Sequence, residues 1–279
     1  MTDAQWRSFT QFKADFAKKT ADWYRRIEHE GLTEVLRALQ KKAAERDGVP
    51  PYSLDTQIVY NRSIDDIKKE DDIKIILIGD NPGKDEQLER NRRYLVGQSG
   101  KIADGFFRKN PELGIDFRKN VLILNKTPLH TAKTKELALL IKEGPPLIAD
   151  IIRESQIWFA EATAKLHRAL CSSFAGQDGC TNVANSAEAR NQCSCKLWLV
   201  GYAELRPKGL FVPYRDALNA AYADCLHEVC GAASAIFVYQ HFSMNRFLID
   251  LNEKSQPELT LKENLRRTGL FHRKEILGW

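Results

Sequence analysis

The chain has 279 residues, with 42 Lys and Arg against 37 Asp and Glu, so its formal net charge is +5. This mildly basic balance permits a nucleic-acid partner without requiring one. No apolar run approaches the roughly 20 residues of a membrane-spanning helix, which excludes a membrane partner. The first residues, MTDAQWRSFTQFK, contain no apolar signal core, so we expect a cytoplasmic protein.

The N-terminal segment, residues 1–50, is predicted to be helical. Aromatic side chains recur every three or four residues from Trp6 to Phe16, and apolar side chains do so from Leu32 to Leu39. The sequence DGVPPYS ends the second helix, because Gly and Pro interrupt helical structure. We expect these helices to form a packed structural layer, with a cap over the core or a partner surface as the alternatives.

An alternation of strands and helices follows. The apolar runs are rich in Ile, Val and Leu and lie at 74–78, 121–124, 197–200 and 235–239. The helical segments between them are expected at 100–108, 135–169 and 214–229. Apolar strands separated by helices indicate a parallel sheet that is covered on both faces. We therefore expect residues 1–279 to form one α/β domain, a three-layer α/β/α structure around a short, four-stranded, mainly parallel sheet.

Polar side chains follow three of these strands at the point where each strand ends. Asp80 and Asn81 follow the first, Asn125 ends the second, and His241 follows the fourth. Ligands of open parallel sheets bind beyond the carboxyl ends of the strands. Taken singly, an Asn after a strand is usually a turn residue and a lone His a structural one. Taken together, Asn81, Asn125 and His241 are expected to converge on one site.

Several common signatures of enzymes are absent. The sequence contains no GxGxxG, no GxSxG and no HExxH, which disfavours a dinucleotide cofactor, a nucleophile elbow and a zinc hydrolase. GQSGK at 97–101 resembles the end of a phosphate-binding loop, but Leu95 stands where that loop requires glycine. We therefore expect no cofactor.

Six cysteines lie at positions 171, 180, 193, 195, 225 and 230. We predict that 172–195 is a polar, cysteine-containing insertion, and that the cysteines are thiols in a reducing compartment. Cys193 and Cys195 do not have the CxxC spacing of a zinc knuckle, so no metal site is predicted. A metal or a disulfide in this segment stays open as an alternative.

Five segments, in chain order, resemble motifs of the uracil-DNA glycosylase superfamily. GDNPG at 79–83 is similar to the water-positioning GxNPG motif, YLVGQSGK at 94–101 to PFVG and its helix, and LILNKTPLHT at 122–131 to the strand that presents the uracil-reading Asn. LWLVGYAELRPKGL at 197–210 resembles the strand and helix that follow, and HFSMNRF at 241–247 the HPS motif with its duplex-penetrating loop. The single-strand-selective monofunctional branch is the most similar, and the mismatch-specific branch is second.

The resemblance implies a DNA repair enzyme that flips uracil or a related deaminated base out of DNA and hydrolyses its N-glycosidic bond. Asn81 would hold the attacking water, and His241 would donate a hydrogen bond to uracil O2. Asn125 would read the base by accepting from N3–H and donating to O4. DNA contacts are expected from Lys126, Ser243, Met244 and Arg246, of which Met244 or Arg246 would fill the gap left by the flipped nucleotide.

Some positions depart from the family pattern. Leu95 stands where the family has an aromatic that stacks on uracil, and Tyr94 or Phe106 would have to replace it. Phe242 replaces the Pro of HPS, and Asp80, at a variable position, would contact the base through its backbone N–H. The alternatives are therefore a catalytically weak or inactive member that binds nucleic acid or a nucleobase, and a nucleotide-binding regulatory domain. For the enzyme we expect a monomer whose partner is DNA containing uracil or a related lesion.

Overall fold

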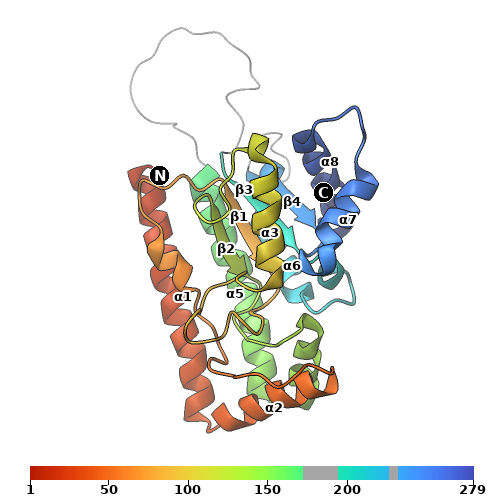
Figure 1. Ribbon diagram of the computed structural model, residues 1–279. Helices are drawn as coiled ribbons and strands as arrows, with labels where there is room; N and C mark the ends of the chain where they lie inside the picture. The colour runs from red at the N-terminus through yellow and green to blue at the C-terminus, as the bar shows by residue number, and fades with distance from the viewer. Residues whose placement is uncertain (172–193, 226–231) are drawn as a thin grey trace.

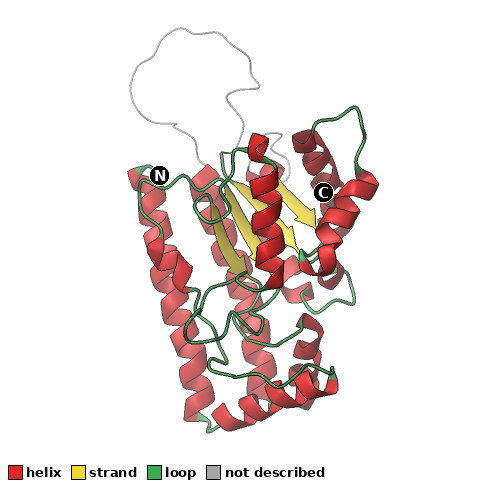
Figure 2. Cartoon of the chain, viewed as in Figure 1, coloured by secondary structure: helices red, strands yellow, loops and turns green. Residues whose placement is uncertain are grey.

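The computed structural model describes residues 1–171, 194–225 and 232–279. Its sheet consists of four parallel strands in the order β2-β1-β3-β4. These strands are β1 (Ile75–Gly79), β2 (Val121–Asn125), β3 (Lys196–Val200) and β4 (Ile236–Tyr239). Each bound lies within one residue of the predicted apolar run. All arrowheads point toward the same loop-rich end of the molecule (Figure 2).

Helices cover both faces of the sheet, which confirms the predicted three-layer α/β/α architecture. Helix α3 (Gln98–Lys109) lies in front of the strands, and α5 (Pro146–Cys171) lies behind them (Figure 1). Helix α6 (Val212–Tyr222) packs along α5, and α8 (Leu261–Leu277) packs against β4. Because both faces are covered, every residue of β1 and β2 is buried.

The N-terminal helices are α1 (Asp3–His29) and α2 (Thr33–Arg46). Helix α1 packs along α5 through aromatic rings: the Trp158 ring lies 6.1 Å from Phe12 and 5.9 Å from Trp23. Helix α2 packs on α4 (Leu137–Glu143), the short helix that precedes α5. Side chains of α1 and α2 therefore belong to the same buried cluster as those of the sheet.

Two C-terminal helices were not assigned from the sequence, namely α7 (Arg246–Lys254) and α8. The start of α8 carries a readable signal, since Thr260 and Glu263 form a capping box. Helix α6 ends at Tyr222, earlier than the predicted helix 214–229, and a 3₁₀ turn, Ala223–Cys225, follows it.

No helix in the described ranges is both long and apolar enough to cross a bilayer. The predicted insertion 172–195 lies outside the described residues except for Ser194 and Cys195. Cys171, which precedes it, is disulfide-bonded, so the expectation of a thiol is wrong at that position. The thiol of Cys195 is buried, and burial raises its pKa to about 12.

Candidate active site

The carboxyl ends of the strands bring the predicted site residues to one edge of the sheet. Gly79 at the end of β1 is in register with Asn125 at the end of β2, and Val200 on β3 is in register with Tyr239 on β4. The residues that follow these positions therefore enter the same loop region. Asn81 follows β1, and Asn125 ends the adjacent strand β2. His241 follows β4, which is separated from β1 by β3 and so lies about 10 Å from β1 at the usual strand spacing.

The orientation of the Asn81 amide is set by its neighbours. Its Nδ2 lies 2.8 Å from Thr131 Oγ1 and 3.2 Å from the carbonyl oxygen of Leu129. A carbonyl only accepts, and the Thr131 hydroxyl donates its own hydrogen to the Lys133 carbonyl, so the atom facing both must be the amide donor. No described residue donates a hydrogen bond to Oδ1 of Asn81, which is left for an external partner.

Asn125 is 2% exposed, and its side chain folds over the end of β1. A Cβ atom on Gly79 would lie 2.5 Å from Asn125 Oδ1, so only glycine leaves room for this amide. Its Nδ2 has no hydrogen-bond partner among the described residues. A buried donor without a partner costs about 1–3 kcal/mol, which makes this amide a candidate for binding a ligand.

Lys126 does not face solvent, contrary to the predicted contact with DNA phosphate. Its side chain is 0% exposed, and Nζ lies 2.6 Å from Asp80 Oδ1 and 2.6 Å from the carbonyl oxygen of Val200. The ring of Phe211 lies 4.9 Å from Nζ and closes the site further. The prediction is wrong because the loop after β2 turns inward over the ends of β1 and β3, where Lys126 is bonded to their carbonyls.

The loop after β4 holds His241 as a neutral imidazole with a defined tautomer. The Ser243 backbone N–H donates to His241 Nδ1 at 3.1 Å, and the Ser243 hydroxyl lies 2.8 Å from the same atom. Because Nδ1 accepts, the ring proton is on Nε2, which is a donor. Burial lowers the pKa of His241, an effect that Asp80 opposes and Lys126 reinforces, so the neutral form is favoured.

Phe242 anchors this loop in the core. It is completely buried, and its ring lies 4.5 Å from that of Phe247. The Phe247 backbone N–H also donates to the His241 carbonyl at 3.0 Å. Beyond this anchor, Met244 and Asn245 both have positive φ angles, and Met244 is 77% exposed. The loop therefore presents Met244 to solvent, and Arg246 is exposed beside it.

The predicted base-stacking positions are not available to a base. Tyr94 is 0% exposed, and its hydroxyl donates to the Val59 carbonyl at 2.7 Å. Leu95 is buried with φ of 50°, and its backbone N–H and carbonyl are both bonded within the protein. Phe106 packs edge-on against Phe247 in the core. These residues act in packing. Hydrogen bonds hold the segment of Tyr94 and Leu95 against the core, and Phe106 packs within it.

Glu86 is a residue of this region that sequence reasoning missed. It is buried, and its two carboxyl oxygens accept from the backbone N–H groups of Gly83 and Leu95 at 3.1 and 2.9 Å. Burial raises the pKa of Glu86 to about 7, although the two N–H donors oppose the change. Glu86 thus ties the loop that carries Asn81 to the start of the α3 segment. The sequence around Glu86 contains no motif that indicates this role.

Thr131 and His130 were also missed as supports of Asn81. His130 is 0% exposed; its Nδ1 lies 2.9 Å from the Pro82 carbonyl and its Nε2 lies 2.9 Å from the Tyr52 hydroxyl. Burial lowers the pKa of His130 to about 4, so the ring is neutral. Gln40 of α2 donates to the His130 carbonyl at 2.8 Å. The N-terminal layer therefore supports the loop that orients Asn81.

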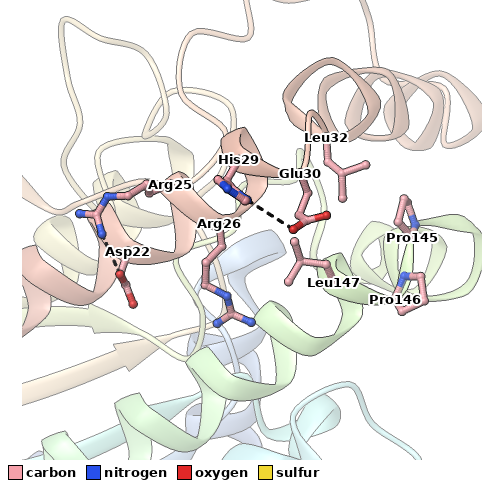
Figure 3. A pocket seen from close by; sticks show the side chains of 9 residues that line it. All are labelled: Asp22, Arg25, Arg26, His29, Glu30, Leu32, Pro145, Pro146 and Leu147. Carbon is pink, nitrogen blue, oxygen red and sulfur yellow. Dashed lines mark hydrogen bonds and ion pairs between the residues drawn. The ribbon is translucent and has the colours of Figure 1, made fainter.

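A cavity elsewhere in the molecule is lined by other residues than the predicted site. A cavity of about 560 Å³ lies between the end of α1 and the turn from α4 to α5 (Figure 3). Among its side chains, Arg25 pairs with Asp22 at 3.0 Å, and Arg26 pairs with Glu154 of α5. The Nδ1 atom of His29 lies 3.5 Å from a carboxyl oxygen of Glu30. None of the predicted site residues lines it. In the described part of the chain, no group of three or more His, Cys, Asp or Glu could hold a metal ion.

Comparisons with protein-family models, curated proteins and solved structures found no match to this chain.

Proposed function

We propose that this protein is a DNA glycosylase that hydrolyses the N-glycosidic bond of uracil or a related deaminated base. One observation carries the proposal: an acceptor oxygen, Asn81 Oδ1, and a neutral donor, His241 Nε2–H, are held at the same edge of the sheet. An open acceptor and a neutral donor are the two groups that this hydrolysis requires.

The chemistry assigns each group a role. Breaking the bond between N1 of the base and C1′ leaves the electron pair on the base and a cationic sugar. Asn81 Oδ1 orients a water whose oxygen bonds to C1′, and the water loses a proton that ends on the base. His241 Nε2–H donates to uracil O2, where negative charge develops. A donor aimed at developing charge is worth about 10²- to 10³-fold in rate.

Asn125 is the proposed reader of the base. Its buried Nδ2, which has no partner within the described chain, would donate to O4 of uracil, and its Oδ1 would accept from N3–H. Cytosine presents the reverse pattern and leaves the amide mispaired. Met244 is exposed, and it and Asn245 are two successive residues with positive φ. Met244 would enter the base stack, and Ser243 and Arg246 would contact phosphate. A monomeric state and a cytoplasmic location complete the proposal.

A second candidate function is binding of nucleic acid or a nucleobase without cleavage. The burial of Tyr94 and Leu95 favours it, because neither offers a face on which a flipped base could stack.

The test is incubation of the purified protein with a uracil-containing oligonucleotide, followed by alkaline cleavage of abasic sites. We expect strand breaks with the wild type and a loss of about 10²- to 10³-fold in Asn81→Ala and His241→Ala. Gel shift without strand breaks would identify the non-cleaving binder. A result with neither strand breaks nor a gel shift would contradict both functions.

A further inference from the structure

A buried ion pair lies between the two amides of the candidate site. Asp80 directly precedes Asn81, and Lys126 directly follows Asn125. The side chains of the pair are 8% and 0% exposed, and Nζ of Lys126 lies 2.6 Å from Asp80 Oδ1. The role proposed for the site gives no function to this pair.

Lys126 connects the carboxyl ends of three strands. Its ammonium has three hydrogens and three acceptors: Asp80 Oδ1 and the Val200 carbonyl at 2.6 Å each, and the Gly79 carbonyl at 3.3 Å. Its backbone N–H lies 3.0 Å from the carbonyls of both Gly79 and Asp80. One residue at the end of β2 is therefore bonded to the ends of β1 and β3.

The Asp80 carboxylate is confined from the other side. Oδ2 accepts from the Thr134 hydroxyl at 3.2 Å. Gly201, with φ of +92°, passes so close that a Cβ atom there would lie 2.2 Å from Asp80 Oδ1. Only a glycine both adopts this φ and leaves room for the carboxylate. The packing therefore permits little displacement of Asp80.

We propose that the Asp80–Lys126 pair is a positioning element, which fixes the distance and relative orientation of Asn81 and Asn125 across the ends of β1 and β2. This inference rests on the proposed function, in which one amide holds the water and the other holds the base. A displacement of about 1 Å between reacting groups can lower a rate by about 10²-fold. The same pair also sets the charge around His241, since Asp80 and Lys126 act on its pKa in opposite directions.

A buried ion pair is by itself weak evidence for a contribution to stability. Replacing a buried ion pair by uncharged side chains of similar volume is often neutral or stabilising, whereas removing one partner alone leaves a buried charge. The double variant Asp80→Asn/Lys126→Met therefore tests the effect of the pair on the positions of Asn81 and Asn125 without leaving a buried charge. Lys126→Met alone leaves the Asp80 carboxylate without its cation beside His241, and so tests the effect of charge.

The experiment measures kcat and KM on a single-stranded uracil oligonucleotide, together with side-chain ¹⁵N order parameters of Asn81 and Asn125. In the double variant we expect kcat to fall about 10²-fold with KM within about threefold, and the order parameters to fall from about 0.85 to below about 0.6. In Lys126→Met we expect the pKa of His241, followed by NMR, to rise above the wild-type value. Arg26→Met/Glu154→Gln, which removes an ion pair between α1 and α5, is the control and retains wild-type kcat.

The readouts separate two failures. If the wild type does not excise uracil but the order parameters fall in the double variant, the proposed function is wrong and the positioning role stands. Wild-type order parameters in a folded double variant overturn the positioning role, as does a kcat within about threefold of an active wild type. If the double variant does not fold, the pair is a stability element, and the proposal is equally overturned.

Discussion

The strand ends and the cavity of Figure 3 both gather charged and polar side chains, but they hold them differently. At the strand ends, Lys126 and Asp80 are almost fully buried and every donor of the ammonium is used. In the cavity, the side chains of Arg25 and His29 are 68% and 84% exposed, and each contacts a carboxylate near it in the chain. Exposed contacts of this kind contribute little to stability, because solvent screens them.

The two regions therefore differ in how firmly their polar side chains are held. Burial lowers the local dielectric constant, so hydrogen bonds among buried groups fix their orientation and tautomer. Asn81 and His241 each have one defined donor and acceptor arrangement. Around the cavity, Arg26 is held by two hydrogen bonds to Glu154, whereas Arg25 and His29 contact exposed carboxylates that are near them in the chain.

Of the variants that distinguish these two regions, Asn125→Asp is expected to have the largest effect. A carboxylate cannot donate to O4 of uracil, so excision of uracil should fall on the order of 10²-fold or more, and the preference over other bases should change. Kinetics on oligonucleotides that each contain one candidate base measure this. Unchanged selectivity would contradict the reading role of Asn125.

The next effect comes from Thr131→Val, which removes the hydroxyl that orients the Asn81 amide. Only the longer contacts to the Leu129 and Pro82 carbonyls then hold the amide donor, so the orientation of the amide is less restricted. We therefore expect kcat to fall about tenfold, equivalent to about 1.4 kcal/mol. Thr131→Ser keeps the hydroxyl and is the matched control. If the Val and Ser variants have equal kcat, the orientation of Asn81 is set by other contacts.

Glu86 predicts a pH dependence of stability. The folded-state pKa of about 7 lies above the ordinary value of 4.5, so between these values the unfolded chain releases a proton that the folded chain keeps. This contribution to stability is complete below about pH 4.5 and is lost as the pH rises through 7. Its size is at most about 3 kcal/mol.

The measurement is the free energy of unfolding in urea at pH 5, 6.5 and 8. Glu86→Gln cannot titrate, so the decline from pH 5 to pH 8 should be steeper in the wild type than in this variant. Comparing the two slopes removes the contributions of other groups, such as His130, whose lowered pKa acts in the opposite direction. Parallel slopes would show that Glu86 titrates normally.

The smallest effect is expected at the cavity of Figure 3. Arg25→Ala and His29→Ala remove exposed side chains, so kcat should stay within about twofold of the wild type and stability within about 0.5 kcal/mol. A loss of excision comparable to that of Asn125→Asp would remove the distinction between the two regions.

Local sequence patterns determined much of this protein. The apolar runs identified all four strands of the described sheet, and their lengths and the intervening helices identified the α/β class. Because Asn81, Asn125 and His241 lie at or after strand ends, the sequence predicts them at one edge of a parallel sheet, whatever the order of the strands. These inferences succeed because strand periodicity and the parallel connection depend mainly on neighbouring residues.

The tertiary structure decided the state of each side chain. The sequence could not show that Lys126 is buried, that Tyr94 and Leu95 are occupied in packing, or that Thr131 sets the Asn81 amide 50 positions away. Burial and hydrogen-bond orientation depend on the strand order β2-β1-β3-β4 and on contacts between segments far apart in the chain. Local periodicity carries no information about such contacts, so the sequence predicts which residues lie at the strand ends but not their protonation, orientation or support.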